Sequence, residues 1–325
     1  MHDFAYARAT RTEDALALRE APTTAVLAGG TEILNWMRIG IATPASLLDI
    51  RGIPGLDRIE RIDGGLRIGA LCRLSDVAGD PGVSRDYPAL SSAILQSASA
   101  QLRNLATIGG NPLQRVRCPY FRADTIDACN KRRPGSGCAA YDGVNERMAI
   151  FGWTPDCVAV QPSDPAVVFA ALDAVLVTER TGGGRRIPMT TFHTLPGEDP
   201  ARHHVLEAGE LIVAIELGPP ARQSAYLKVR ERQSYEYALV SAAAVLDLDG
   251  TIIRRARLAL GSVAMRPWRL DAAEAALTGL DVASPALVEA VAEGFADARA
   301  LSSNAWKITL ARNAALRAIH LAAGR

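Results

Sequence analysis

Four of the five cysteines in the 325-residue chain fall between positions 118 and 157. They are Cys118, Cys129, Cys138 and Cys157, separated by ten, eight and eighteen residues. Such thiols can be inert, form two disulfides, bind zinc, or hold an iron–sulfur cluster. Inert cysteines usually occupy apolar periodic segments, disulfides are rare in the cytoplasm, and zinc sites favour closely spaced pairs. The pattern favours a metal centre and leaves zinc and a cluster equally open.

The surrounding segment supports this interpretation. From Asn111 to about Pro155 it shows no helical or strand periodicity, and a segment this long without structure needs something else to hold it. Its basic residues could offset the charge of an anionic cluster, although a solvated loop explains them equally well. They are Arg115, Arg117, Arg122, Lys131, Arg132 and Arg133. The fifth cysteine, Cys72, lies in the apolar run IGALCRL and is predicted to be an ordinary buried thiol.

Three glycine-rich stretches could bind a phosphate. AGGTEIL (residues 28–34) joins a predicted strand to a predicted helix, where free N–H groups suit a phosphate or simply form a tight turn. TIGGNP (residues 107–112) follows a predicted helix and is also typical of a helix C-cap. Two such loops would suit a long ligand with a pyrophosphate if they met in space. GSGCAA (residues 135–140) fits the dinucleotide fingerprint only formally, because no strand precedes it.

Composition excludes several classes of protein. The net charge of +1 does not indicate binding to nucleic acid or to an anionic membrane. No apolar run is long enough for a membrane span. The N-terminus does not resemble a signal peptide, so a cytoplasmic location is the default expectation.

The elements that must position these residues are predicted from periodicity. A strand–helix–strand unit is expected within residues 24–50, and Ser75 is a plausible helix N-cap. A strand, a turn, a helix and a second strand are expected over residues 156–180, and a hairpin around Asp249-Gly250. Further helices are expected at residues 12–21, 88–106, 271–278, 285–298 and 305–323.

Several stretches resemble the FAD-binding medium subunit of the molybdenum hydroxylase (xanthine dehydrogenase) family. They are AGGTEIL, SASAQLRNLATIGGNP, QPSDPAVVFAALDA and YLKVRERQSYEYALVSAAAVL, and the likeness covers nearly the whole chain. The stretch QRVRCPYFRADTIDACNKRRPGSGCAAYDG is similar to an insertion in the bacterial periplasmic-type aldehyde oxidoreductase branch, whose FAD subunit carries a [4Fe-4S] cluster. The FAD subunit of 4-hydroxybenzoyl-CoA reductase has a comparable insertion.

The resemblance implies an α/β (α+β) fold. It consists of a PCMH-type FAD-binding region of two α/β subdomains (about 1–55 and 56–220, with a cluster insertion at about 112–157) and a C-terminal domain (221–325) with a small antiparallel sheet and helices. The implied FAD contacts are Ala28, Gly29, Gly30, Thr31, Glu32, Ile33, Leu34, Thr107, Gly109, Gly110, Asn111, Asp164 and Lys228. The implied cluster ligands are the four cysteines. From the residues alone, Asp164 could equally cap a helix and Lys228 could be an exposed strand residue.

The implied function is electron transfer without a catalytic residue in this chain. A large molybdopterin-binding subunit would oxidise an aldehyde or N-heterocycle, a small subunit would carry [2Fe-2S] clusters, and this chain's FAD would reduce an external acceptor. His193, His203 and His204 are expected to be loop or surface residues. The alternatives are a self-contained FAD oxidase of the PCMH superfamily and a zinc-stapled binding module without redox chemistry. A partner with a twin-arginine signal could carry the complex to the periplasm.

Overall fold

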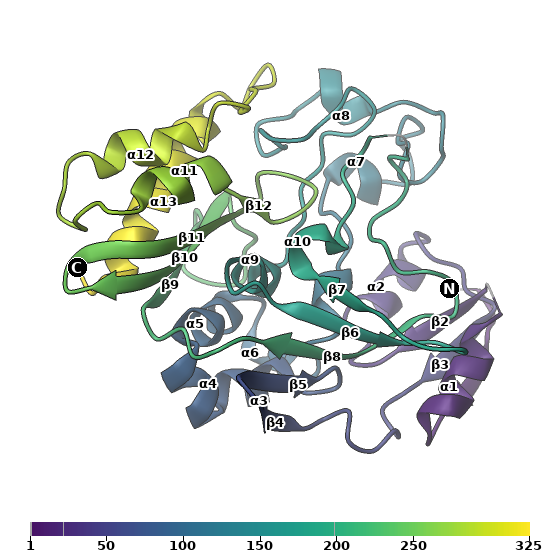
Figure 1. Ribbon diagram of the computed structural model, residues 1–325. Helices are drawn as coiled ribbons and strands as arrows, with labels where there is room; N and C mark the ends of the chain where they lie inside the picture. The colour runs from purple at the N-terminus through teal and green to yellow at the C-terminus, as the bar shows by residue number, and fades with distance from the viewer. Residues whose placement is uncertain (1, 22, 198) are drawn as a thin grey trace.

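A computed structural model describes residues 2–21, 23–197 and 199–325, in which the chain forms three sheets (Figure 1). The N-terminal sheet has the strand order β1-β3-β2 and is parallel throughout. Its strands and helices are β1 (Ala5–Arg8), α1 (Thr12–Arg19), β2 (Thr24–Leu27), α2 (Ile33–Arg38) and β3 (Ser46–Asp49). The predicted strand–helix–strand unit is therefore confirmed, whereas β1 was not predicted.

The middle sheet is antiparallel, with the order β4-β5-β8-β6-β7. Its strands are β4 (Ile59–Ile62), β5 (Gly65–Gly69), β6 (Val175–Glu179), β7 (Arg186–Pro188) and β8 (Leu211–Leu217). The short helix α10 (Met189–Phe192) follows β7. Four helices follow β5, namely α3 (Leu74–Gly79), α4 (Pro81–Asp86), α5 (Pro88–Gln96) and α6 (Ala100–Arg103).

Two sequence predictions about these helices are wrong in detail. Ser75 lies inside α3, which begins one residue earlier, and Arg73 occupies its N-cap. The helix predicted over residues 88–106 is broken after Gln96, because Ala98 adopts a left-handed backbone with φ 47° and the Ser99 hydroxyl caps the new helix α6. The break lets the following chain turn back toward β5.

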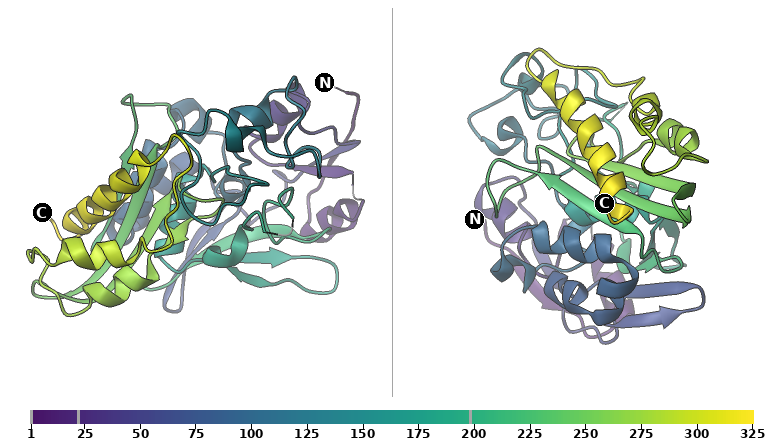
Figure 2. Two further views of the ribbon diagram at one scale, coloured as in Figure 1. Left: turned by 90° about the horizontal axis from the view of Figure 1, so that it is seen from above. Right: turned by 90° about the vertical axis from the view of Figure 1, so that its left-hand side faces the viewer.

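The C-terminal sheet has the order β12-β11-β10-β9 and is antiparallel. Its strands are β9 (Ser224–Val229), β10 (Val240–Asp249), β11 (Ile252–Gly261) and β12 (Trp268–Arg269), and the helices are α11 (Asp271–Leu277), α12 (Leu287–Glu293) and α13 (Trp306–Ala322). The hairpin at Asp249-Gly250 and the three helices are confirmed. Figure 2 shows α13 lying across the sheet, where it packs on β9 and β10. The expected domain boundaries near residues 55 and 220 stay predictions.

One short helix joins the middle and C-terminal sheets. All eight residues of α9 (Asp164–Ala171) are buried, and the helix packs against α5, β10 and β11. The strand predicted directly before α9 is absent. The chain there makes single hydrogen bonds to separate partners instead: Ala149 N donates to Val158 O, and Gln161 N to Ala264 O (2.8 Å each). This stretch therefore bonds to the cysteine-rich segment and to the connection between β11 and β12, and joins neither sheet.

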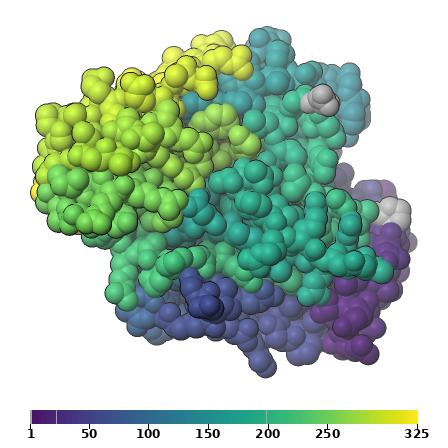
Figure 3. Space-filling model, viewed as in Figure 1, coloured from purple at the N-terminus to yellow at the C-terminus, as the bar shows by residue number. Residues whose placement is uncertain are grey.

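The cysteine-rich segment, residues 111–157, is mostly irregular, as predicted. It contains only the short turns η1 (Asn111–Leu113), α7 (Pro119–Arg122) and α8 (Ala139–Asp142) as helical structure. It nevertheless has a small apolar core of its own, which the sequence did not indicate; its buried residues include Val116, Phe121, Ala140 and Met148. In Figure 3 the segment forms the blue-teal surface beside the yellow C-terminal residues. None of the helices among the described residues is long and apolar enough to cross a bilayer.

The cysteine-rich segment is anchored to α13 by a buried lysine. Lys307 is fully buried, and its Nζ donates to the carbonyls of Arg147 and Met148 at 2.8 Å each. Asn304 Nδ2 adds bonds to Met148 O (3.2 Å) and Ala149 O (3.1 Å). Burial lowers the pKa of Lys307 to about 7. The end of the segment is thereby fixed to the C-terminal helix.

We predict that Lys307→Met destabilises the protein by roughly 1–3 kcal/mol, because two buried carbonyls lose their donor. Urea unfolding measures this, with Arg312→Gln on the exposed face of α13 as the control. The folded pKa lies below the unfolded one, so from pH 7 to 9 the unfolded state binds more protons at this position. Wild type should therefore gain stability relative to Lys307→Met over that range. Equal unfolding midpoints at all pH values would contradict this anchoring role.

Candidate functional site

The two glycine loops line the same large cleft, which has a volume of ≈ 1620 Å³. All thirteen residues that the sequence assigned to cofactor contacts line it, including Asp164 and Lys228. The start of the cysteine-rich segment and the loop at residues 232–237 form further walls. The structure thus brings the predicted residues together, and their contact with a cofactor stays a prediction.

The first loop packs directly against the chain that leads into the second. A Cβ on Gly29 would lie 2.0 Å from the Leu105 carbonyl oxygen, so only glycine allows this approach. Gly30 has φ +75°, which also favours glycine. Among the described residues none accepts a hydrogen bond from the N–H groups of residues 29–33. Five consecutive free donors at the cleft can bind an anionic group.

The second loop is not a helix C-cap. Helix α6 ends at Arg103, well before Gly109 and Gly110, and neither glycine has a positive φ. Gly109 N donates to Ala70 O at 2.9 Å, and a Cβ there would lie 2.6 Å from the Ala70 Cβ. Gly109 is therefore required for packing on the end of β5. No described residue accepts a bond from the N–H of Gly110, which lines the cleft.

A buried hydrogen-bond network holds this second loop in place. Gln161 Nε2 donates to the carbonyls of Pro112 and Gln114 at 3.2 Å each, and its Oε1 accepts from Ser163 N at 2.6 Å. The Ser163 hydroxyl donates to Asn111 Oδ1 at 2.5 Å and also accepts from Ala166 N, which caps α9. Two side chains just before α9 thus fix three successive parts of the loop.

His193 completes the network and is not a surface residue. It is only 3% exposed, and its Nε2 lies 2.8 Å from the Pro112 carbonyl and 2.9 Å from Gln161 Nε2. Burial lowers the pKa of His193 to about 4, so the ring is neutral near pH 7. His203 and His204 are partly buried and line the cleft, and burial lowers the pKa of both. All three histidines lie outside helices and strands, in keeping with the expected loop positions, but none is exposed, because these chain segments pack inward behind the loop.

Asp164 and Lys228 pair with each other. Lys228 Nζ lies 2.8 Å from Asp164 Oδ2 and also donates to Gln96 O at 3.1 Å, while the Tyr226 hydroxyl donates to Asp164 Oδ1 at 2.5 Å. Both charged residues are buried. Burial raises the pKa of Asp164, which Lys228 opposes. The two simpler interpretations are wrong: Ser163 caps the helix instead of Asp164, and Lys228 is not exposed.

The cleft contains many polar atoms without partners. Nine buried side-chain nitrogen and oxygen atoms lack a hydrogen bond within the described residues, and six belong to side chains that line this cleft. These six are Arg19 Nε, Glu32 Oε2, Trp36 Nε1, Arg117 Nε, Arg122 Nη1 and His204 Nδ1. Buried polar groups are normally paired, so their concentration here indicates a polar ligand.

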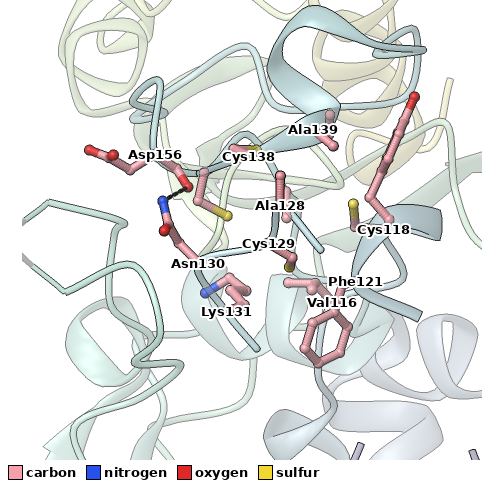
Figure 4. A pocket seen from close by; sticks show the side chains of 14 residues that line it. Val116, Cys118, Phe121, Ala128, Cys129, Asn130, Lys131, Cys138, Ala139 and Asp156 are labelled. Carbon is pink, nitrogen blue, oxygen red and sulfur yellow. Dashed lines mark hydrogen bonds between the residues drawn. The ribbon is translucent and has the colours of Figure 1, made fainter. Parts of the chain in front are cut away.

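The four clustered cysteines line one small cavity (Figure 4). Cys129 and Cys138 face each other across an isolated bridge of the backbone. Burial raises the pKa of Cys118 to about 12 and also raises that of Cys157. Their thiolates would therefore need a compensating positive charge. Cys72 lies in the main core and is separate, as predicted.

The four thiols line the cavity without forming a ready metal site. Across residues 2–21, 23–197 and 199–325, no three His, Cys, Asp or Glu side chains form a group that could hold a metal ion. Among the basic residues expected beside the cysteines, only Lys131 lines the cavity. Arg115, Arg117 and Arg122 line the cleft instead, which corrects their predicted role.

Sequence reasoning missed Tyr226, Gln161, Ser163 and His193. Tyr226 could have been found, because it lies two residues before Lys228 and so shares its face of β9. Gln161 and Ser163 immediately precede Asp164 in QPSD, a stretch noticed only as a resemblance. For His193 the sequence carries no signal, because its partners are more than thirty residues away.

We predict that Lys228→Met destabilises the protein by about 3–5 kcal/mol, because it leaves a buried carboxylate unpaired. Without Lys228 the folded pKa of Asp164 would rise further above its unfolded value, so the stability of this variant should increase more strongly than that of the wild type as the pH falls. The Asp164→Asn/Lys228→Met double variant should recover much of the loss and lose the pH dependence. Urea unfolding tests this, and additive losses in the double variant would disprove the coupling.

Comparison with known proteins identifies relatives of this chain. Residues 2–220 match the family described as the FAD binding domain in molybdopterin dehydrogenase, and residues 225–322 match the CO dehydrogenase flavoprotein C-terminal domain. The chain is 46% identical over 316 residues to the aldehyde oxidoreductase FAD-binding subunit PaoB of Escherichia coli, covering 96% of both chains. It is 29% identical to the putative xanthine dehydrogenase FAD-binding subunit XdhB of Escherichia coli, covering 84% of this chain and 79% of that one.

The fold agrees with these matches. A chain of the reconstituted CO dehydrogenase from Oligotropha carboxidovorans superimposes with a TM-score of 0.78 at 25% identity, covering 100% of this chain and 99% of that one. The free N–H groups, the paired glycine loops and the unpartnered polar atoms of the cleft all suit a dinucleotide with a pyrophosphate. The chain therefore belongs to the FAD-binding subunits of the molybdenum hydroxylase, or xanthine dehydrogenase, family of oxidoreductases.

Proposed function

We propose that this chain is the FAD and iron–sulfur electron-transfer subunit of a molybdenum-dependent aldehyde oxidoreductase. A large molybdopterin-binding subunit oxidises the aldehyde, a small [2Fe-2S] subunit relays the electrons, and FAD in this chain passes them to an external acceptor. The observation that carries the proposal is the arrangement of two cavities around one stretch of chain. The 46% identity to an aldehyde oxidoreductase FAD-binding subunit supports the aldehyde as substrate.

FAD fits the large cleft. The free N–H groups of residues 29–33 and of Gly110 would hold its pyrophosphate, and the buried Asp164–Lys228 pair, which lines the same cleft, would contact it elsewhere along its length. When bound, FAD supplies the redox chemistry, and the protein contributes position and electrostatics. The network around Gln161 fixes the second loop before the cofactor arrives, which lowers the entropic cost of binding.

We assign the [4Fe-4S] cluster to the cysteine cavity, because all four cysteines line it and four cysteine thiolates are the ligand set of such a cluster. The positive iron atoms would stabilise thiolates whose pKa burial raises. Lys131 lies at the same cavity, and its Nζ donates to Pro200 O at 2.6 Å, so a cation is fixed near the anionic cluster.

One extended stretch separates the two cavities. Val116 and Cys118 line the cysteine cavity, whereas the alternate residues Arg115 and Arg117 line the cleft. This alternation is typical of an extended chain. A single layer of residues therefore separates the two cavities, so a change of charge in one cavity acts on the other across that layer. This closeness supports a redox role for the cysteines over a purely structural one.

The two alternatives have less support. A self-contained FAD oxidase needs catalytic side chains for its substrate. The charged side chains at the cleft are arginines, Lys228 and carboxylates that already pair, and they stand beside neutral histidines and the tyrosines Tyr235 and Tyr237. A zinc-stapled binding module would not explain the cleft. Absorbance distinguishes them, because flavin and cluster colour the protein and zinc does not.

We predict that Gln161→Leu lowers FAD affinity by at least about tenfold, because Pro112 O and Gln114 O lose their donor and the second loop loosens. Flavin fluorescence on titration of the deflavinated protein measures the Kd. Gln223→Leu, at an exposed glutamine outside the cleft, is the matched control. An unchanged Kd in Gln161→Leu would show that the network does not prepare the cofactor loop.

We predict that Cys129→Ser removes the iron and sulfide of a [4Fe-4S] cluster, about four of each per chain in the wild type. FAD should bind more weakly as well, because the same segment forms the wall of the cleft. Cys72→Ser is the control and should retain all the iron. One zinc and no iron in the wild type would contradict the cluster, and so would full iron content in Cys129→Ser.

A further inference from the structure

The cleft is lined by arginines that have no carboxylate partner. Of the arginines lining it, six form no ion pair with any described residue. These six are Arg19, Arg38, Arg115, Arg122, Arg202 and Arg232. An arginine is always charged in a protein, so each of them contributes a full positive charge to the cleft.

The carboxylates of the cleft do not neutralise them, because each already pairs with another cation. Glu32 pairs with Arg117, Asp164 with Lys228, Glu210 with Arg185, and Glu236 lies 3.8 Å from Arg147. The surplus of positive charge in the cleft therefore exceeds the negative charge of one pyrophosphate. A cleft with low-dielectric walls concentrates such a field and attracts anions.

Part of this surplus of positive charge lies near exposed tyrosines that line the cleft. Arg117 stacks on Tyr237 with 4.8 Å between guanidinium carbon and ring centroid, and Arg122, at the end of α7, lines the same cleft with its Nη1 buried and without a partner among the described residues. Tyr237 is 43% exposed and Tyr235 57%. Arg232, also exposed, stacks on Tyr235 with 5.8 Å between guanidinium carbon and ring centroid. Two arginines without a carboxylate partner among the described residues, Arg122 and Arg232, thus line the cleft together with these exposed tyrosines.

We propose that the external electron acceptor of this subunit is a small anionic oxidant, which Arg122 and Arg232 attract into the cleft toward the flavin. This inference rests on the proposed function and adds the chemical class of the acceptor. The reaction balances with a one-electron acceptor such as ferricyanide. Oxidation of an aldehyde with water gives a carboxylic acid, two electrons and two protons; the electrons reduce two ferricyanide ions to ferrocyanide, and the protons pass to solvent.

Acceptors of opposite charge test the proposal on the assembled complex. Aldehyde-dependent reduction of ferricyanide, an anion, and of hexaammineruthenium(III), a cation, is measured from low to high ionic strength and expressed per bound flavin. For ferricyanide, kcat/KM should fall as salt increases, whereas for the cation it should rise or stay level. Each acceptor is compared only with itself across salts and variants, because the two differ in driving force.

The variants are Arg122→Gln and Arg232→Gln, with Arg312→Gln on α13 as a control that changes the net charge equally. Each cleft variant should lower kcat/KM for ferricyanide by roughly three- to tenfold and flatten its salt dependence, without lowering that for the cation. The control should match the wild type. The proposal is overturned if both acceptors respond alike, or if the salt dependence persists unchanged in both cleft variants, which would place the anion outside the cleft.

Anaerobic bleaching of the flavin by aldehyde separates this inference from the proposed function. If aldehyde bleaches the flavin but the rates do not depend on the charge of the acceptor, only the inference of an anionic acceptor is overturned. If aldehyde does not bleach the flavin of the assembled complex, the proposed function fails and the inference fails with it.

Discussion

The arrangement of the cleft depends on the buried hydrogen bonds of QPSD, residues 161–164, at the start of α9. Gln161 holds the carbonyls of Pro112 and Gln114, and the next polar residue, Ser163, binds Asn111 and caps the helix. Asp164 then pairs with Lys228 of the C-terminal sheet. Because α9 is buried between two sheets, it can position both walls at once. Buried polar groups without hydrogen-bond partners are costly, so the loss of one member of this network should strongly destabilise the protein.

The cysteine-rich segment is a structural part of the cleft and not an appendage. It starts from the second glycine loop, supplies arginines to the wall of the cleft, and is fixed to α13 by the bonds of Lys307 to Arg147 and Met148. Its own apolar core is small, so its order depends on these attachments. Coupling between the thiol cavity and the flavin cleft follows from this shared backbone.

Local signals were sufficient for much of the fold. The strand–helix–strand unit, the hairpin at Asp249-Gly250 and the C-terminal helices follow from periodicity and turn residues. The break at Ala98 could not be predicted, because the sequence there remains helical in pattern while tertiary packing imposes a left-handed residue. The directions in which the Arg115 and Arg117 side chains point also could not be predicted from the sequence. They depend on which side of an extended stretch faces which cavity, and that is decided by contacts far along the chain.

The central claim is that the cleft binds a flavin dinucleotide through both glycine loops. Titrating the deflavinated protein with FAD and, separately, with FMN tests it most directly. FMN lacks the pyrophosphate and the adenosine, so it cannot satisfy the free N–H groups of residues 29–33 in the same way. We predict one FAD per chain and an affinity for FMN at least about tenfold weaker. Equal affinities, or no retained flavin, would contradict the assignment of the cleft.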